Sequence, residues 1–129
     1  MSTIKVDTIK NTSNVEVFTA KAWVNFDGKQ TAGNMIRESG NVSSITDNGT
    51  GDYTVTFTTA MTDANYAVIA SCMMGDNLGV SESFGVKGNA SSGNMTAPAL
   101  QSTTAVRLLD QDADGSDRDN PNLYVAVFR

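Results

Sequence analysis

The stretch SITDNGTGDYTVTFTT, residues 44–59, decides the fold class of this chain. From Tyr53 to Phe57 large apolar residues occupy every other position, and threonines lie between them. Such alternation predicts a strand with one buried and one open face. The Asn48-Gly49 pair before it supplies residues that adopt positive φ in a tight turn. Residues 44–59 are therefore predicted to form an antiparallel β-hairpin whose aromatic face points inward.

Short runs of the same kind recur along the chain, separated by turn-forming residues, and no segment has the apolar period of an amphipathic helix. About eight to ten short strands at regular spacing are typical of a sandwich or a barrel. We therefore expect an all-β fold, an antiparallel β-sandwich of jelly-roll-like type with an N-terminal extended arm. Besides the hairpin, strands are predicted at 3–9, 15–19, 21–26, 35–39, 41–46, 65–74, 80–86, 103–109 and 123–128.

Two of these predicted strands carry further expectations. In residues 21–26 the residues Ala22, Val24 and Phe26 share one face, which predicts that this face is buried. In residues 65–74 both faces are apolar, and the β-branched and aromatic content favours a strand over a helix. Residues 65–74 are therefore predicted to form a central strand that is covered on both sides.

The first residues of the chain are predicted to form a separate arm. The segment 3–9 alternates like a strand, and turn-forming residues at 11–14 set it apart from the remainder of the chain. We expect an N-terminal arm at 1–19 and a β-sandwich domain at 20–129. An isolated strand leaves its edges unpaired, so pairing with a neighbouring subunit would satisfy them. The apolar residues expected to anchor the arm are Ile4, Val6 and Ile9.

Composition excludes several functional classes. The chain has 129 residues, a net charge of −5, no histidine and a single cysteine, Cys72. An acidic chain is a poor match for nucleic acid, and no apolar run approaches the roughly 20 residues of a membrane span, so neither is expected as a partner. Disulfide frameworks, thiolate metal sites and histidine-based triads are excluded within one chain. No cofactor is predicted.

The acidic segment 110–120 is the clearest candidate for a metal site. Its first residues read DQDADG, the first half of a calcium-binding loop, in which alternate oxygen ligands converge on the cation. The twelfth position of such a loop requires a bidentate glutamate, and here it is Pro121. The favoured interpretation is a solvated hairpin tip that turns at Asp-Gly. Weak cation binding by Asp110, Asp112 and Asp114 is the alternative.

Carboxylates that could act in catalysis are present, but they form no recognisable pair. A glycosidase needs two acids that flank one sugar bond. Glu38, Asp52 and Glu82 are available, and nothing in their spacing marks two of them as convergent. Cys72 lies in an apolar run without a histidine to activate it, which favours a core thiol. The spacing of these residues therefore marks no catalytic residue.

Four aromatic residues could stack on sugars: Trp23, Phe26, Tyr53 and Tyr66. An aromatic residue on a strand is more often part of the core. Trp23 is the exception, because the alternation around it places its side chain opposite Ala22 and Val24. Its outward face is expected to contact another chain, a ligand or the N-terminal arm.

Several segments resemble tail-fibre-like and structural proteins of tailed phages, notably cyanophages. They are STIKVDTIKNTS at 2–13, AKAWVNFDG at 20–28, NVSSITDNGTGDYTVTFTTAM at 41–61 and VAVFR at 125–129. The likeness spans most of the chain in the same order, and the segment 41–61 is the most specific. Residues 74–100 depart from the family, as does the acidic segment, where relatives are rich in serine and asparagine.

This resemblance implies a non-enzymatic virion protein that works as a homo-oligomer, with a homotrimer as the expected state. Its partners would be other virion proteins of the tail or the capsid and, at the host, a surface glycan. Three hypotheses remain. The first is a tail-fibre or receptor-binding module anchored by its arm. The second is a capsid decoration or knob protein attached to the head shell, which the absence of a long shaft favours. The third is a soluble protein that binds or degrades carbohydrate.

Overall fold

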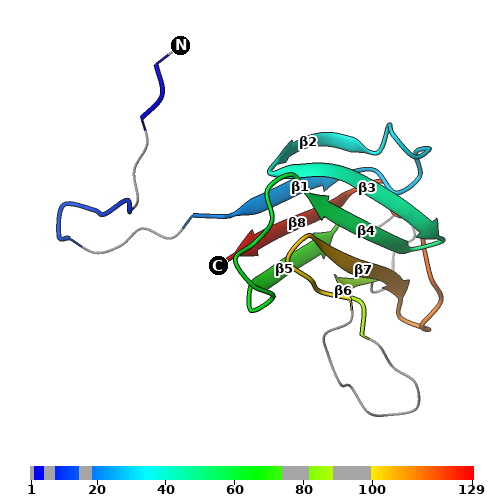
Figure 1. Cartoon of the computed structure of the whole chain (residues 1–129). Helices are drawn as coiled ribbons and strands as arrows, with labels where there is room; N and C mark the ends of the chain where they lie inside the picture. Colours follow the sequence, from blue (N-terminus) through cyan, green and yellow to red (C-terminus); the bar gives the residue numbers. More distant parts are fainter. Residues whose placement is uncertain (1, 5–7, 15–18, 74–81, 89–99) are drawn as a thin grey trace.

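The computed structural model describes residues 2–4, 8–14, 19–73, 82–88 and 100–129, which contain eight strands and no helix. The strands form two antiparallel four-stranded sheets that face each other, with the order β2-β1-β8-β5 in one and β3-β4-β7-β6 in the other (Figure 1). This confirms the predicted all-β sandwich. The strands are β1 (Ala22–Phe26), β2 (Ile36–Gly40), β3 (Val42–Gly49), β4 (Asp52–Phe57), β5 (Ala67–Cys72), β6 (Glu82–Val86), β7 (Ala105–Asp112) and β8 (Leu123–Phe128).

The core lies between the two sheets and is built from alternate residues of their strands. In β1, β4 and β8 every second side chain is buried, as period-2 alternation dictates. The ring of Phe26 packs edge-on against Tyr53 at 5.3 Å and against Phe84 at 6.1 Å, and so joins the sheets. The predicted inward face of the β3–β4 hairpin is therefore confirmed. Its predicted turn pair is wrong, because Asn48 and Gly49 belong to β3 and the chain turns at Thr50 and Gly51. The buried apolar residues are Ala22, Val24, Phe26, Met35, Ile45, Tyr53, Val55, Phe57, Met61, Tyr66, Phe84, Val106, Leu108, Leu123, Val125 and Val127.

Asn41 carries the chain from one sheet to the other. It has a φ of 55°, a left-handed conformation that asparagine tolerates better than most residues. Its amide group donates to the carbonyl oxygens of Lys21 (2.9 Å) and Thr59 (3.1 Å), and its side-chain oxygen accepts from the Thr59 amide. One side chain thus ties the corner between β2 and β3 to the start of β1 and the end of β4.

The prediction of a covered central strand at 65–74 is wrong. The strand β5 stands at the edge of its sheet, and its residues alternate between exposed and half-buried. Val68, Ala70 and Cys72 pack against the core, whereas Ile69 on the other face is 62% exposed. The apolar residues on both faces of this segment predicted burial of both faces, but in the structure the face of β5 that carries Ile69 is exposed to solvent.

The described residues of the N-terminal arm lie away from the sandwich (Figure 1). Its described residues, 2–4 and 8–14, belong to none of the eight strands, so the predicted strand at 3–9 is not found in them. Ile4 is 88% exposed and Ile9 is 51% exposed. Val6 and most of the predicted strand 15–19 lie outside the described residues. Among the described residues, hydrogen bonding of the N-terminal part to the sandwich begins at Lys21, whose amide donates to the carbonyl oxygen of Val127 at 2.7 Å.

Candidate binding face

The outer face of the sheet β2-β1-β8-β5 exposes a row of mostly apolar residues. The register places Gly40, Trp23, Ala126 and Ile69 side by side across the four strands. Trp23 is 41% exposed, so this face presents an aromatic ring and an isoleucine to solvent. The prediction that Trp23 points away from the core is therefore confirmed. We call this surface the Trp23 face.

Gly40 makes room for the Trp23 ring. A Cβ atom on Gly40 would lie 2.8 Å from Cδ1 of Trp23 and nearer still to Nε1, so no larger residue fits without moving the indole. The ring therefore rests directly on the backbone of β2. A tryptophan held in this way keeps its position while part of its surface remains in contact with water.

A groove of about 370 Å³ runs along the Trp23 face. Ala126 lies between Trp23 and Ile69 in the register, and its methyl group leaves a hollow between these two larger side chains. Two residues along the strands, Tyr124 of β8 lies between Asn25 of β1 and Ser71 of β5. The residues that line the groove are Trp23, Val24, Asn25, Ile69, Ser71, Tyr124, Val125 and Ala126.

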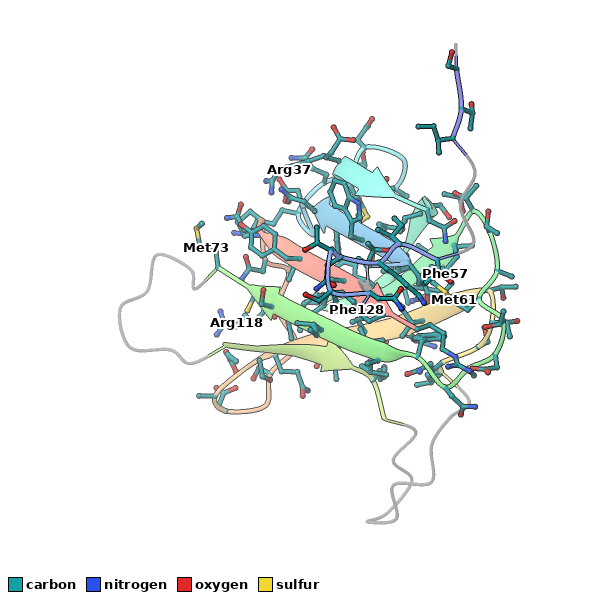
Figure 2. The ribbon with its side chains drawn as sticks, turned by 90° about the vertical axis from the view of Figure 1, so that its left-hand side faces the viewer. Arg37, Phe57, Met61, Met73, Arg118 and Phe128 are labelled. Atoms are coloured by element: carbon teal, nitrogen blue, oxygen red, sulfur yellow. The ribbon has the colours of Figure 1, made fainter. Side chains whose placement is uncertain are left out.

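A polar network lies beside Asn25, one of the residues that line the groove. Arg37 donates to Asp27 at 3.0 Å, to Asn122 at 3.1 Å and, in a longer contact of 3.5 Å, to the side-chain oxygen of Asn25. The amide of Met73 donates to the carbonyl oxygen of Asn122, which brings the end of β5 to the same place. Figure 2 shows Arg37 and Met73 at one end of the sandwich, with Phe57 and Met61 at the other.

The outer face of the opposite sheet is different, because a charged cluster and hydroxyl groups cover it. The carboxylate of Asp52 accepts hydrogen bonds from Arg107 at 2.6 and 2.8 Å and also forms an ion pair with Lys87. Threonines of β3 and β4 lie beside it, as the alternation predicts. Of the two outer faces, the one that carries Trp23 is therefore the better candidate for binding.

The Asp52 cluster gives a prediction for acid stability. The hydrogen bond from Arg107, followed by the contacts with Lys87, lowers the pKa of Asp52 from 3.8 to about 2 although burial opposes the shift. A carboxyl group with a depressed folded-state pKa stabilises the fold fully above its unfolded pKa, and the contribution disappears as the pH falls from about 4 to about 2. We expect Asp52 to account for about 1–2 kcal/mol of the stability lost in this window.

Urea unfolding of the wild type and of Asp52→Asn at pH 6 and pH 2 measures this contribution. The free-energy difference between the two proteins should be larger at pH 6 and should shrink at pH 2, where Asp52 is close to half protonated. An equal difference at both pH values would contradict the role of the carboxylate charge.

The predicted acidic loop is partly a strand. Asp110 and Asp112 belong to β7 and are buried, because their side chains point between the sheets like Val106 and Leu108. The carboxylate of Asp112 accepts from the Arg118 side chain at 2.6 Å and from the Ser116 amide at 3.1 Å. The interpretation of 110–120 as a solvated tip is therefore wrong for its first residues, and the turn at Gly115 begins after Asp112.

The weak alternative of a calcium site is not supported by this geometry. Asp114 accepts from the Ser116 amide at 2.9 Å, so its carboxylate, like that of Asp112, stabilises the turn itself. Asp119, further along, accepts from the hydroxyl of Tyr53 at 2.7 Å and from the amide of Gly51 at 2.8 Å. Among the described residues no group of three or more acidic, histidine or cysteine side chains is placed to hold a metal ion.

The other candidate residues from the sequence are dispersed. Phe26, Tyr53 and Tyr66 are buried, so of the four candidate sugar-stacking aromatics only Trp23 is accessible. Burial and the hydrogen bond to Asp119 raise the pKa of Tyr53, and its hydroxyl remains a donor. Cys72 packs against the core, as expected of a core thiol.

The candidate carboxylates do not converge in the described residues. Glu38 lies on β2 and Asp52 lies on β4, so they belong to different sheets, and Asp52 is held by two cations. Glu82 lies on β6, next to β7, and its side chain is outside the described residues. Glu38 and Asp52 are therefore not a pair arranged around a common sugar bond.

Sequence reasoning misses three residues of the candidate face: Gly40, Ile69 and Ala126. Ile69 falls in a strand predicted to be covered, and Gly40 and Ala126 carry no chemical group that would mark them. The signal that was available is the alternation of 65–74, which places Ile69 on one face with Ala67 and Ser71. Only the strand order shows that this face continues the face of Trp23.

Comparison of the chain with protein-family models finds no match, and comparisons with curated proteins and with solved structures find none either. The described part of the chain has no helix long and apolar enough to cross a membrane. The function of the protein therefore has to be inferred from the fold and from the surface chemistry of the Trp23 face.

Proposed function

We propose that the protein is a non-enzymatic bacteriophage virion structural protein, a tail-fibre or receptor-binding module that attaches the particle to the host surface. The observation that carries this proposal is the exposed Trp23 face on a sandwich whose opposite face is covered by charged and hydroxyl groups. An exposed apolar surface bordered by polar residues marks an interaction site. The resemblance of several sequence segments to tailed-phage structural proteins is the reason for placing this surface on a virion.

The proposal includes no catalytic step. What supports this is the separation of Glu38 and Asp52 on different sheets, and the ion pairs that hold Asp52. An attachment protein needs only a stable scaffold and an accessible surface, and the sandwich and the Trp23 face supply both. Release of reducing sugar from host envelope polysaccharide by the purified protein would contradict this part of the proposal.

A capsid decoration protein on the head shell is the second candidate. The observation that favours it is the N-terminal arm, because its residues Ile4 and Ile9 are exposed and are not part of the sandwich core. Apolar side chains on an extended segment suit binding to a neighbouring virion protein, by strand addition or in a groove. In either setting we propose that the arm is the anchor and that the assembly is a homotrimer.

Immunogold labelling of intact virions tests the proposal directly. An antibody against residues 20–129 should label the tail tip if the protein is a fibre or receptor-binding module. Label distributed over the head would favour the decoration protein instead. Particles without label, from preparations in which the protein is expressed, would contradict both candidates. Light scattering on the purified protein would measure its oligomeric state.

Deletion of residues 1–19 tests the anchor. Because the eight strands begin at Ala22, we expect the truncated protein to keep its fold, with a Tm within about 3 °C of the full chain, a shift of less than about 1 kcal/mol. We expect it to lose incorporation into particles, measured by immunoblotting of purified virions. The double variant Ile4→Ser, Ile9→Ser preserves the length of the arm and should show the same loss. Normal incorporation of the truncated protein would contradict the role of the arm.

A further inference from the structure

We infer that the hollow between Trp23 and Ile69 binds a neutral sugar ring, stacked against the Trp23 indole, as part of a larger glycan. This deepens the receptor-binding role proposed above and rests on that proposal for its biological setting. It assigns a ligand class to a particular site, the groove over Ala126 on the sheet β2-β1-β8-β5.

The shape of the hollow suits one ring. Trp23 and Ile69 stand on strands two positions apart, with Ala126 of β8 between them. Neighbouring strands lie about 4.8 Å apart, so the two walls are separated by about 10 Å at the backbone. A single pyranose fits between such walls, with the methyl group of Ala126 beneath it.

The chemistry of the hollow matches the two kinds of surface on a sugar. A pyranose presents an apolar face of C–H groups, whose partial positive charge is attracted to the negative face of an aromatic ring. Its hydroxyl groups point outward around the ring and need hydrogen-bond partners. The groove provides a partner for each kind of surface. Trp23 supplies an aromatic surface for the C–H groups, and the polar side chains of Asn25 and Ser71, which also line the groove, can hydrogen-bond to the hydroxyl groups.

Asn25 is oriented by its neighbour. Arg37 lies 3.5 Å from the side-chain oxygen of Asn25, a long contact that favours the amide orientation in which the NH2 group is the donor toward a ligand. The same arginine is held by Asp27 and Asn122, so this polar border is positioned before any ligand arrives. Preorganised polar groups of this kind lose little entropy on binding.

The charges beside the groove favour a neutral sugar over an acidic one. The guanidinium of Arg37 is balanced by the carboxylate of Asp27 at 3.0 Å. Glu38 lies opposite Asn25 in the register and is exposed, so its carboxylate would repel an acidic sugar. The chain as a whole carries a net charge of −5, which acts in the same direction.

The size of the Trp23 face argues against a second copy of the chain as its occupant. Four strands of five or six residues cover about 14 by 18 Å, or about 250 Å². A stable protein interface buries about 800 Å² on each partner. The outline of the Trp23 face is therefore small beside a stable protein interface, whereas it is ample for one or two sugar rings.

Trp23 itself reports on binding, because it is the only tryptophan in the chain. We would titrate the full-length protein with lactose, maltose and cellobiose, and with 3′-sialyllactose as the acidic comparison, and follow tryptophan fluorescence. The expected result is a saturable change in emission with at least one neutral disaccharide, together with protection from acrylamide quenching. For a pair of sugars that differs only in the acidic residue, we expect the acidic one to bind about tenfold more weakly, which corresponds to about 1.4 kcal/mol.

Two variants alter the hollow while retaining the tryptophan. Ala126→Val fills the space beneath the ring, and Gly40→Ala displaces the indole, so each should weaken the binding of the responding disaccharide about tenfold or more. Thr46→Val, on the outer face of the opposite sheet, is the matched control and should bind like the wild type. Circular dichroism verifies that each variant is folded.

Three outcomes would overturn the inference. The first is no saturable change with any neutral disaccharide up to about 10 mM, which excludes even the millimolar affinities of weak single-ring binding. The second is a change that Ala126→Val leaves intact. The third is an emission shift that depends on protein concentration and not on sugar, which would assign the Trp23 face to a second copy. Virion labelling is independent of these results, so failure of the sugar site and failure of the virion role are distinguishable.

Discussion

Gly51→Ala is expected to destabilise the sandwich by about 3 kcal/mol or more, for two reasons that add. Gly51 has a φ of 68°, which costs an alanine about 1 kcal/mol. A Cβ atom there would also lie 2.8 Å from the backbone nitrogen of Arg118 and nearer still to the carbonyl oxygen of Asp110. Because these are backbone atoms, the turn between β3 and β4 would have to separate from β7 and from the loop after it.

Thermal unfolding followed by circular dichroism measures this effect, with Gly115→Ala as the matched control. Gly115 has a φ of 84° and nothing within 4 Å of the position of a Cβ atom, so it incurs the backbone strain without the overlap. At about 4 °C for each kcal/mol, Gly51→Ala should lower the Tm by about 12 °C or more and Gly115→Ala by about 4 °C. Equal shifts in the two variants would show that the overlap is relieved at little cost.

Phe26→Ala is expected to cost about 3–5 kcal/mol, the range for removal of a large buried aromatic side chain. Phe26 is completely buried and contacts aromatic rings of the opposite sheet, Tyr53 on β4 and Phe84 on β6. The loss would therefore leave a cavity at the place where the two sheets meet. Such a change is a large part of the roughly 5–15 kcal/mol by which a domain of this size is stable.

Denaturant unfolding compares Phe26→Ala with Phe128→Ala, a half-buried phenylalanine at the end of β8. The control removes the same group from a partly solvated position and should cost less than half as much, because less surface is re-exposed to water. A cost below about 1.5 kcal/mol for Phe26→Ala would mean that neighbouring side chains fill the cavity, and that this ring does not hold the sheets together.

The parts of the fold that were predictable from the sequence are those in which local pattern and tertiary contacts agree. The strands of the β3–β4 hairpin follow strict alternation, and their inward residues are buried as expected, although the turn lies two residues after the predicted Asn48-Gly49 pair. The same holds for β1, in which Ala22, Val24 and Phe26 form part of the core as predicted. Alternation is a property of the extended chain itself, so it needs no knowledge of neighbouring strands.

The prediction for 65–74 was wrong because coverage of a strand depends on its neighbours. Two apolar faces fit a central strand, but they equally fit an edge strand whose second face belongs to a binding surface. The position of β5 beside β8, at the end of its sheet, is a matter of strand order. Ile69 is exposed for that reason, and no local feature distinguishes the two cases.

The acidic segment illustrates the same division. A run of aspartates predicts a solvated loop, because buried charges are costly. Asp110 and Asp112 are buried nevertheless, since β7 continues through them and Arg118 returns to pair with the carboxylate of Asp112. These contacts form because residues 116–119 fold back onto β7, and the composition of the segment does not predict them.

The candidate site was half predictable. The outward direction of Trp23 follows from alternation, and its exposure is confirmed. Its neighbours Gly40, Ala126 and Ile69 come from three other strands, far apart in the sequence, and only the register places them in one row. The likeness to phage structural proteins stays a prediction, which labelling of virions would test.

The sequence by itself thus determined that this chain forms strands, which side of β1 and β4 is buried, and that Trp23 points outward. These properties depend on the period of two in an extended chain and on the residues that allow tight turns. The tertiary structure alone decided which strands stand at the edges, which acidic side chains are buried, and that a small alanine lies between Trp23 and Ile69. Those outcomes depend on contacts between residues distant in the sequence, where pairing order and register create a surface that no local pattern encodes.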